Sequence, residues 1–102
     1  MTTNRLEVDK FDGKRNFELW KLKVHDLLVQ YGQYKALLRR DKKPEWITDD
    51  EWEEMDMKAL ATIRMCLADE VLFNIIGEKT AFELWVKLES LYQNKSITNG
   101  FS

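Results

Sequence analysis

The sequence has little of the residues that define several protein classes: its 102 residues include one cysteine, one proline, one histidine and four glycines. The single cysteine, Cys66, cannot form an internal disulfide, which excludes a secreted disulfide scaffold and fits a reducing compartment. Scarce proline and glycine argue against a disordered chain. No apolar run approaches the roughly 18–20 residues of a membrane span, and the charged N-terminus is not a signal peptide. We therefore expect a cytoplasmic protein that does not associate with membranes.

The composition of the sequence indicates one soluble domain. Hydrophobic residues make up 44% of the chain, charged residues 33% and aromatic residues 12%. A chain of this length buries roughly two thirds of its extended surface on folding, so it can form a core without metals or disulfides.

Charge is nearly balanced overall, with a net charge of -2, but it is unevenly distributed. Residues 1–47 contain 11 Lys and Arg against 7 Asp and Glu, whereas residues 48–102 contain 5 against 11. A near-neutral domain is a poor general binder of nucleic acid, because phosphate affinity requires an accumulation of Lys and Arg. The uneven distribution suggests head-to-tail attraction between copies. The alternative is that the segregation disappears once the chain is folded.

Apolar residues recur with the 3.6-residue period of helices, which predicts an all-α fold. We expect a small bundle of about five helices, at residues 17–31, 33–40, 48–67, 69–76 and 80–92. Apolar and polar residues alternate from Leu6 to Phe11, which predicts a short extended arm that docks Leu6, Val8 and Phe11 on the core. The expected organisation is an arm at 1–15, a helical domain at 16–95 and a tail at 96–102.

Residues that cap helices mark the expected boundaries. Four polar residues stand where an N-cap is needed, and two of them precede a glutamate by three residues, as in a capping box. These N-caps are Asn16, Thr48, Asp69 and Thr80, and the capping boxes pair Thr48 with Glu51 and Thr80 with Glu83. Two glycines, Gly32 and Gly77, stand where helices should end.

Residues suited to catalysis or metal binding do not form a recognisable set. His25 is the only histidine, and one histidine with one cysteine cannot supply the three or four ligands of a metal site. Cys66 falls on an apolar helix face, which favours a buried, inert thiol. The four glycines are scattered, so there is no phosphate-binding loop. We predict no enzyme activity, no cofactor and no metal.

Two features suggest binding. The basic cluster from Lys35 to Lys43 lies near two tyrosines and could contact RNA weakly, although a solvated helix end explains it more simply. Trp46 follows Pro44 in a predicted loop, where an exposed tryptophan would be a typical interface residue and packing against the loop is the alternative. The candidate interface comprises Trp46, Lys42, Lys43, Asp49 and Asp50.

The order and spacing of the large residues resemble the N-terminal part of the Gag polyprotein of copia-type LTR retrotransposons, especially those of plants. The resemblance extends from Leu6 to Asn99, and its strongest part runs from Thr80 to Tyr92 and continues at Ser96-Ile97-Thr98-Asn99. Each motif is weak alone, but the ordered set is specific. The other matching positions are Phe11, Gly13, Asn16, Phe17, Trp20, Leu28, Gly32, the Trp-containing segment 46–52, Ala59 to Leu67, Ile75 and Ile76.

The resemblance implies a helical, capsid-forming protein without enzymatic activity, whose partners are itself or full-length Gag. Nucleic acid is not expected to bind through this domain alone. The matching residues would be structural anchors, and together with the apolar stripes they give the set Phe17, Trp20, Trp52, Trp85, Leu88 and Tyr92. Gly13 and Gly32 would be turn positions.

The sequence departs from the family at its end, because family members continue into further helices and usually a zinc knuckle. We expect an excised N-terminal capsid domain, a truncated copy or a co-opted cellular gene. The leading hypothesis is self-association in assembly of virus-like particles. The alternative is a stand-alone, domesticated Gag fragment that regulates full-length Gag or acts as a protein-binding adaptor.

Overall fold

A computed structural model describes residues 8–14 and 16–93. It contains four α-helices within these residues: α1 (Phe17–Gln30), α2 (Asp49–Met65), α3 (Asp69–Ile75) and α4 (Ala81–Leu88). The all-α prediction is therefore confirmed in type. The predicted tail at 96–102 and the docking of Leu6 lie outside the described residues. None of the helices described is long and apolar enough to cross a membrane.

The predicted helix at 33–40 is wrong. Two short 3-10 helices, η1 (Tyr34–Leu37) and η2 (Arg40–Lys42), replace it. Leu38 and Arg39 between them have extended backbone, with ψ of 156° and 153°. Neither 3-10 helix has a side-chain cap, and a segment of this length is too short to form a stable helix unaided. The count of about five helices is corrected to four.

The predicted caps are confirmed at α1 and α2. Asn16 accepts a hydrogen bond from the Leu19 amide, and Thr48 and Glu51 form the full capping box. Gly32 has a φ of +70°, in the left-handed region that glycine adopts without strain. Gly13 has a φ of +90°, so both expected turn glycines have positive φ.

Two other cap predictions need correction. Ala68, not Asp69, is the N-cap of α3, and Asp69 is the first helical residue. Thr80 accepts from the Glu83 amide as expected, but the Glu83 carboxylate accepts from the Lys79 amide at 3.4 Å instead of closing the capping box.

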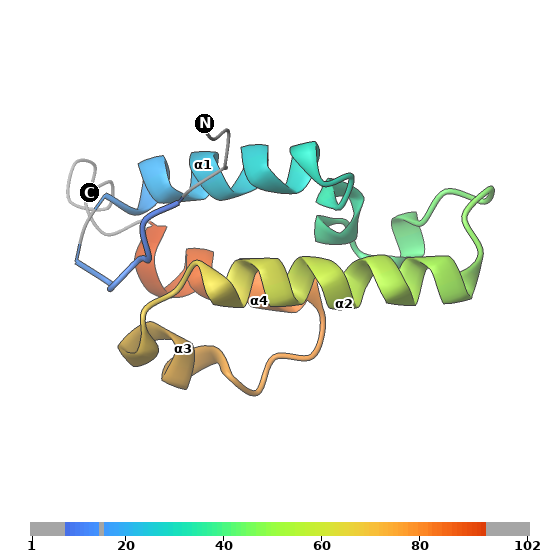
Figure 1. The fold of residues 1–102 in the computed structure, drawn as a ribbon. Helices are drawn as coiled ribbons and strands as arrows, with labels where there is room; N and C mark the ends of the chain where they lie inside the picture. The colour runs from blue at the N-terminus through green and yellow to red at the C-terminus, as the bar shows by residue number, and fades with distance from the viewer. Residues whose placement is uncertain (1–7, 15, 94–102) are drawn as a thin grey trace, which may run out of the picture.

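The helices are arranged around α2. In Figure 1, α1 lies on one side of α2 and α4, and α3 lies on the other side, near the C-terminal end of α2. α2 contacts α1, η1 and α4, and α3 contacts α4. A short π-helical segment, η3 (Glu89–Gln93), continues α4 and contacts α1.

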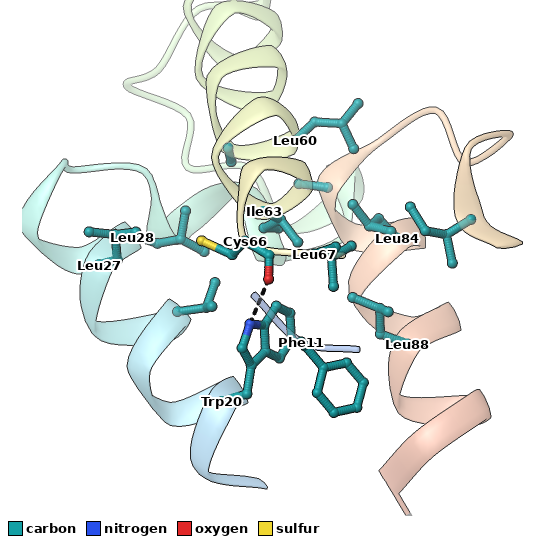
Figure 2. Packing of buried hydrophobic residues seen from close by; sticks show 14 of the residues in the cluster. Phe11, Trp20, Leu27, Leu28, Leu60, Ile63, Cys66, Leu67, Leu84 and Leu88 are labelled. Carbon is teal, nitrogen blue, oxygen red and sulfur yellow. Dashed lines mark hydrogen bonds between the residues drawn. The ribbon is translucent and has the colours of Figure 1, made fainter. Parts of the chain in front are cut away.

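The core lies where α1, α2 and α4 face one another (Figure 2). On α4, Leu84 is fully buried together with Ala81 and Leu88, whereas Trp85 is only half-buried. The predicted stripe of Ala81, Trp85, Leu88 and Tyr92 therefore faces the core, with Trp85 and Tyr92 at its margin, but it did not include Leu84. The complete set of buried residues in this cluster is Phe11, Phe17, Trp20, Val24, Leu27, Leu28, Ala36, Ala59, Leu60, Ile63, Cys66, Leu67, Val71, Ile75, Ala81, Leu84 and Leu88.

The extended arm enters this core, as predicted for Phe11 and Val8. Phe11 is buried and forms an isolated parallel bridge with Leu67, and Val8 packs against the cluster. The Phe11 ring is 5.0 Å from the Tyr92 ring and 5.4 Å from the Trp20 ring, measured between centroids. Such offset and edge-on aromatic pairs add to the free energy gained from burial alone. Phe11 thus joins α1 to η3.

The backbone carbonyl of Cys66, just after α2, accepts two hydrogen bonds. The Trp20 indole Nε1 donates to it at 2.9 Å (Figure 2), and the Phe11 amide donates at 3.0 Å. The last carbonyls of a helix have no partner within the helix. Here α1 and the arm supply both donors, so one oxygen joins three parts of the chain.

We expect Trp20→Phe to reduce the free energy of unfolding by about 1–2 kcal/mol, because it removes the indole donor and leaves a smaller ring in the core. Urea unfolding followed by circular dichroism measures the loss. Trp46→Phe is the matched control: it makes the same chemical change at an exposed side chain and should stay within about 0.5 kcal/mol of the wild type. Equal losses in both variants would contradict the role of the indole hydrogen bond.

Candidate functional site

Trp46 stands out on the surface of the loop before α2. Its side chain is 72% exposed. The Nζ atom of Lys35 lies 5.0 Å from the centre of the Trp46 ring and 5.4 Å from the centre of the Tyr34 ring. A lysine over an aromatic face makes a favourable cation–π contact. We name Tyr34, Lys35 and Trp46 the basic aromatic patch.

The other residues of the predicted interface lie near this patch in the sequence. Lys43 Nζ is 3.5 Å from Asp49 Oδ1, and Arg40 is 3.3 Å from the same oxygen. Lys42, at the end of η2, and Asp50, in the first turn of α2, are exposed. The structure therefore joins Lys43 to Asp49 within one copy of the chain.

Opposite charges from the two halves of the sequence meet inside the monomer. Besides the pairs at Asp49, Lys21 Nζ lies 3.2 Å from Glu89 Oε2. These pairs reduce the charge available to a second copy, because each lysine or arginine already has a carboxylate partner. Among the ion pairs of the described residues, none includes Lys35 or Lys42.

A second exposed patch lies on α3. The Phe73 side chain is 78% exposed and that of Ile76 is 64% exposed. Asp69 and Glu70 are exposed one helical turn before Phe73, and residues three or four apart on a helix are neighbours. We name Asp69, Glu70, Phe73 and Ile76 the acidic apolar patch.

Sequence reasoning missed this patch. The predicted helix at 69–76 included Ile76 among its apolar residues but not Phe73; in the structure Val71 and Ile75 are buried, whereas Ile76 is exposed. Phe73 is two positions from both Val71 and Ile75. Two residues correspond to about 200° around a helix, so the spacing already carried the signal that Phe73 faces outward.

The predicted structural anchors do not all occupy the same environment. Phe17, Trp20, Trp52 and Leu88 are buried, whereas Trp85 and Tyr92 are half-buried and pack against the core cluster. Trp52 is buried outside that cluster. These six side chains lie inside the molecule or at its margin, and none of them belongs to either exposed patch.

Groups capable of chemistry are dispersed. His25 Nδ1 lies 3.9 Å from Asp26 Oδ1 on the exposed side of α1, beyond hydrogen-bond distance. Cys66 is buried, and this burial raises the pKa of its thiol, which favours the unreactive protonated form. Within the described part of the chain, no group of His, Cys, Asp or Glu side chains could hold a metal ion.

Asp56 on α2 connects two helices. Its Oδ1 atom accepts a hydrogen bond at 2.8 Å from the amide of Ala81, the first residue of α4. Partial burial raises the pKa of the Asp56 carboxyl, and the nearby Glu83 carboxylate acts in the same direction, whereas the Ala81 hydrogen bond opposes them. The raised pKa of Asp56 thus follows from its partly buried position at the start of α4.

Comparison with known proteins places this small helical domain in a family. The family model of the gag-polypeptide of LTR copia-type matches residues 24–101. The chain belongs to this family, which is structural rather than catalytic. The chain is also 41% identical, over 99 residues, to the retrovirus-related Pol polyprotein from transposon TNT 1-94 of Nicotiana tabacum. That alignment covers 97% of this chain and 8% of the polyprotein. No solved structure matches the chain significantly.

The raised pKa of Asp56 predicts how its substitutions depend on pH. Because the pKa is higher in the folded protein than its ordinary value of 3.8, ionisation costs stability as the pH rises from below that value to above the folded pKa. Asp56→Asn keeps an acceptor oxygen without the charge, so it should match the wild type at low pH and equal or exceed it at neutral pH. Asp56→Ala also loses the acceptor, so it should be about 1 kcal/mol less stable than Asp56→Asn at every pH.

Urea unfolding of the three proteins over a pH series measures these differences. A wild type that is more stable than the asparagine variant at neutral pH, but not at low pH, would show that the hydrogen bond to the carboxylate outweighs its burial.

Proposed function

We propose that this domain is a non-enzymatic structural part of a Gag capsid and that its biochemical act is self-association in the assembly of virus-like particles. The observation that carries the proposal is that exposed large apolar side chains adjoin one another at two places: Tyr34 and Trp46 lie around Lys35, and Phe73 and Ile76 are three residues apart at α3. Contiguous exposed apolar groups on a soluble protein commonly mark interaction sites.

Membership of the copia-type gag-polypeptide family supports the proposal, because the resemblance noted in the sequence implies a capsid-forming protein. The matched tobacco relative is a transposon polyprotein of which this chain spans about 8%. We propose that the chain provides the corresponding N-terminal assembly domain of such an element, in the cytoplasm.

The two groups with raised pKa values fit a structural role. The Cys66 thiol is buried in the core cluster, and the Asp56 carboxyl receives the first amide of α4. Catalytic groups are perturbed in clefts where a substrate can reach them, whereas here both shifts accompany packing. The proposal therefore assigns no reaction to this domain.

Association through a few exposed side chains should be weak for each contact. Repeated weak contacts between identical subunits can close into rings or extend into larger arrays. Because exposed charges adjoin both patches, we expect the association to weaken as salt screens them.

We expect sedimentation velocity over a concentration series to show reversible growth beyond the monomer, and less growth at high salt than at low salt. Apolar contacts alone would not weaken with added salt, so the salt dependence reports the electrostatic part of the contact. A strict monomer at every concentration and salt level would contradict self-association. If such a monomer also bound a longer Gag chain, the regulatory alternative would be supported instead.

A further inference from the structure

We infer that the basic aromatic patch of one copy binds the acidic apolar patch of the next copy, so that the domain associates head to tail. This inference rests on the proposed self-association and names the two surfaces that meet. Each patch combines a large exposed aromatic side chain, Trp46 or Phe73, with charge of one sign.

The two patches are placed at opposite ends of α2. Trp46 precedes the N-cap of α2 by two residues, and α3 begins four residues after α2 ends. With 17 residues and a rise of about 1.5 Å per residue, α2 is roughly 25 Å long. Figure 1 shows the loop before α2 at one end of the molecule and α3 near the other end. One copy therefore cannot bring its own patches together.

The charges of the two patches are complementary. Lys35 takes part in no ion pair within the described residues, and its Nζ atom lies over the rings of Tyr34 and Trp46. Asp69 and Glu70 likewise form no ion pair there. In a contact between the two patches, Lys35 would face these carboxylates and Trp46 would face Phe73 and Ile76. The charged groups would then have partners of opposite charge, and the apolar groups would be covered.

The same charges oppose the other possible arrangement. In a symmetric dimer that pairs like patches, each patch would face the same patch of the partner. Lys35 would then approach Lys35, or Asp69 and Glu70 would approach the same carboxylates, and close like charges are unfavourable. The charges therefore favour contact between unlike patches. A symmetric dimer that pairs unlike patches twice would stop at two chains, whereas the head-to-tail contact leaves one free patch of each kind at the ends and lets the oligomer grow.

Two single substitutions and their mixture test the inference. Trp46→Ala removes the aromatic group of one patch, and Phe73→Ala removes that of the other. We expect each variant alone to associate about 10-fold or more weakly than the wild type, as is typical for a central aromatic interface residue. An equimolar mixture should form a heterodimer that does not grow further, because each pair of chains has one complete contact and two damaged ends.

Met57→Ala is the matched control. Met57 is a large apolar residue of α2 that is 65% exposed and belongs to neither patch, so its loss should leave association unchanged. Circular dichroism and thermal unfolding verify that the variants fold. Where an alanine variant does not fold, Lys35→Glu and Glu70→Lys replace the pair. Each alone should associate more weakly than the wild type, and their mixture should grow beyond the heterodimer, because the two reversed charges also attract each other.

The possible outcomes separate the inference from the proposed function. If the wild type associates and either single variant associates equally well, the assignment of patches is wrong although self-association stands. If both variants are monomeric and their mixture stays monomeric, the head-to-tail pairing is wrong. If the wild type never associates, the proposed function fails and the inference fails with it.

Binding of RNA to the basic aromatic patch is the competing use of that surface, because aromatic rings and cations also bind single strands. A single-stranded RNA oligonucleotide titrated into the wild type and Trp46→Ala at low salt tests it. RNA binding that depends on Trp46, together with protein association that does not, would overturn the inference.

Discussion

The carbonyl oxygen of Cys66 is the point on which the arrangement of this domain depends. It stands where α2 ends, and it accepts hydrogen bonds from the Trp20 indole and the Phe11 amide. A buried carbonyl without a partner costs roughly 1–3 kcal/mol, and here the arm and α1 each supply a donor to the end of α2. The Phe11 carbonyl in turn accepts from the Ala68 amide, the N-cap position of α3. The arm thereby satisfies backbone groups on both sides of the junction between α2 and α3.

This junction determines which surfaces are left for other molecules. With Phe11 and Trp20 fixed beneath it, α1, α2 and α4 bury their apolar faces against one another (Figure 2). The short α3 buries only Val71 and Ile75 and presents Phe73 and Ile76 to solvent. At the other end of α2, the two 3-10 helices bring Lys35 over Trp46. A rigid helix therefore separates two surfaces of opposite charge, which suits a subunit whose contacts must repeat in a fixed geometry.

Folding also changes how much of the charge segregation in the sequence is available to other molecules. Basic and acidic residues are segregated along the sequence, but Arg40, Lys43 and Lys21 find carboxylates of the second half within the same copy. Charge complementarity between the halves is thus partly satisfied within one copy. Lys35 on one side, and Asp69 and Glu70 on the other, are among the charged residues in no ion pair of the described residues. Such small charged margins around an apolar centre affect the specificity and rate of association more than its strength.

Local chemistry allowed much of this fold to be predicted from the sequence. The helix type, the caps at Asn16 and Thr48, the turn at Gly32 and the docking of Phe11 follow from periodicity and from hydrogen bonds made within a few residues. The family resemblance could also be recognised from the sequence, because it depends only on the order and spacing of the large residues.

Tertiary structure decided the rest, since each remaining feature depends on groups far apart in the chain. The segment 33–40 became two 3-10 helices instead of one α-helix, and Leu84, which the predicted stripe did not include, is fully buried on α4. The partner of Trp46 is Lys35, eleven positions away, and the Cys66 carbonyl receives its donors from α1 and the arm. Sequence spacing describes one element at a time, whereas the contacts between elements depend on how those elements pack.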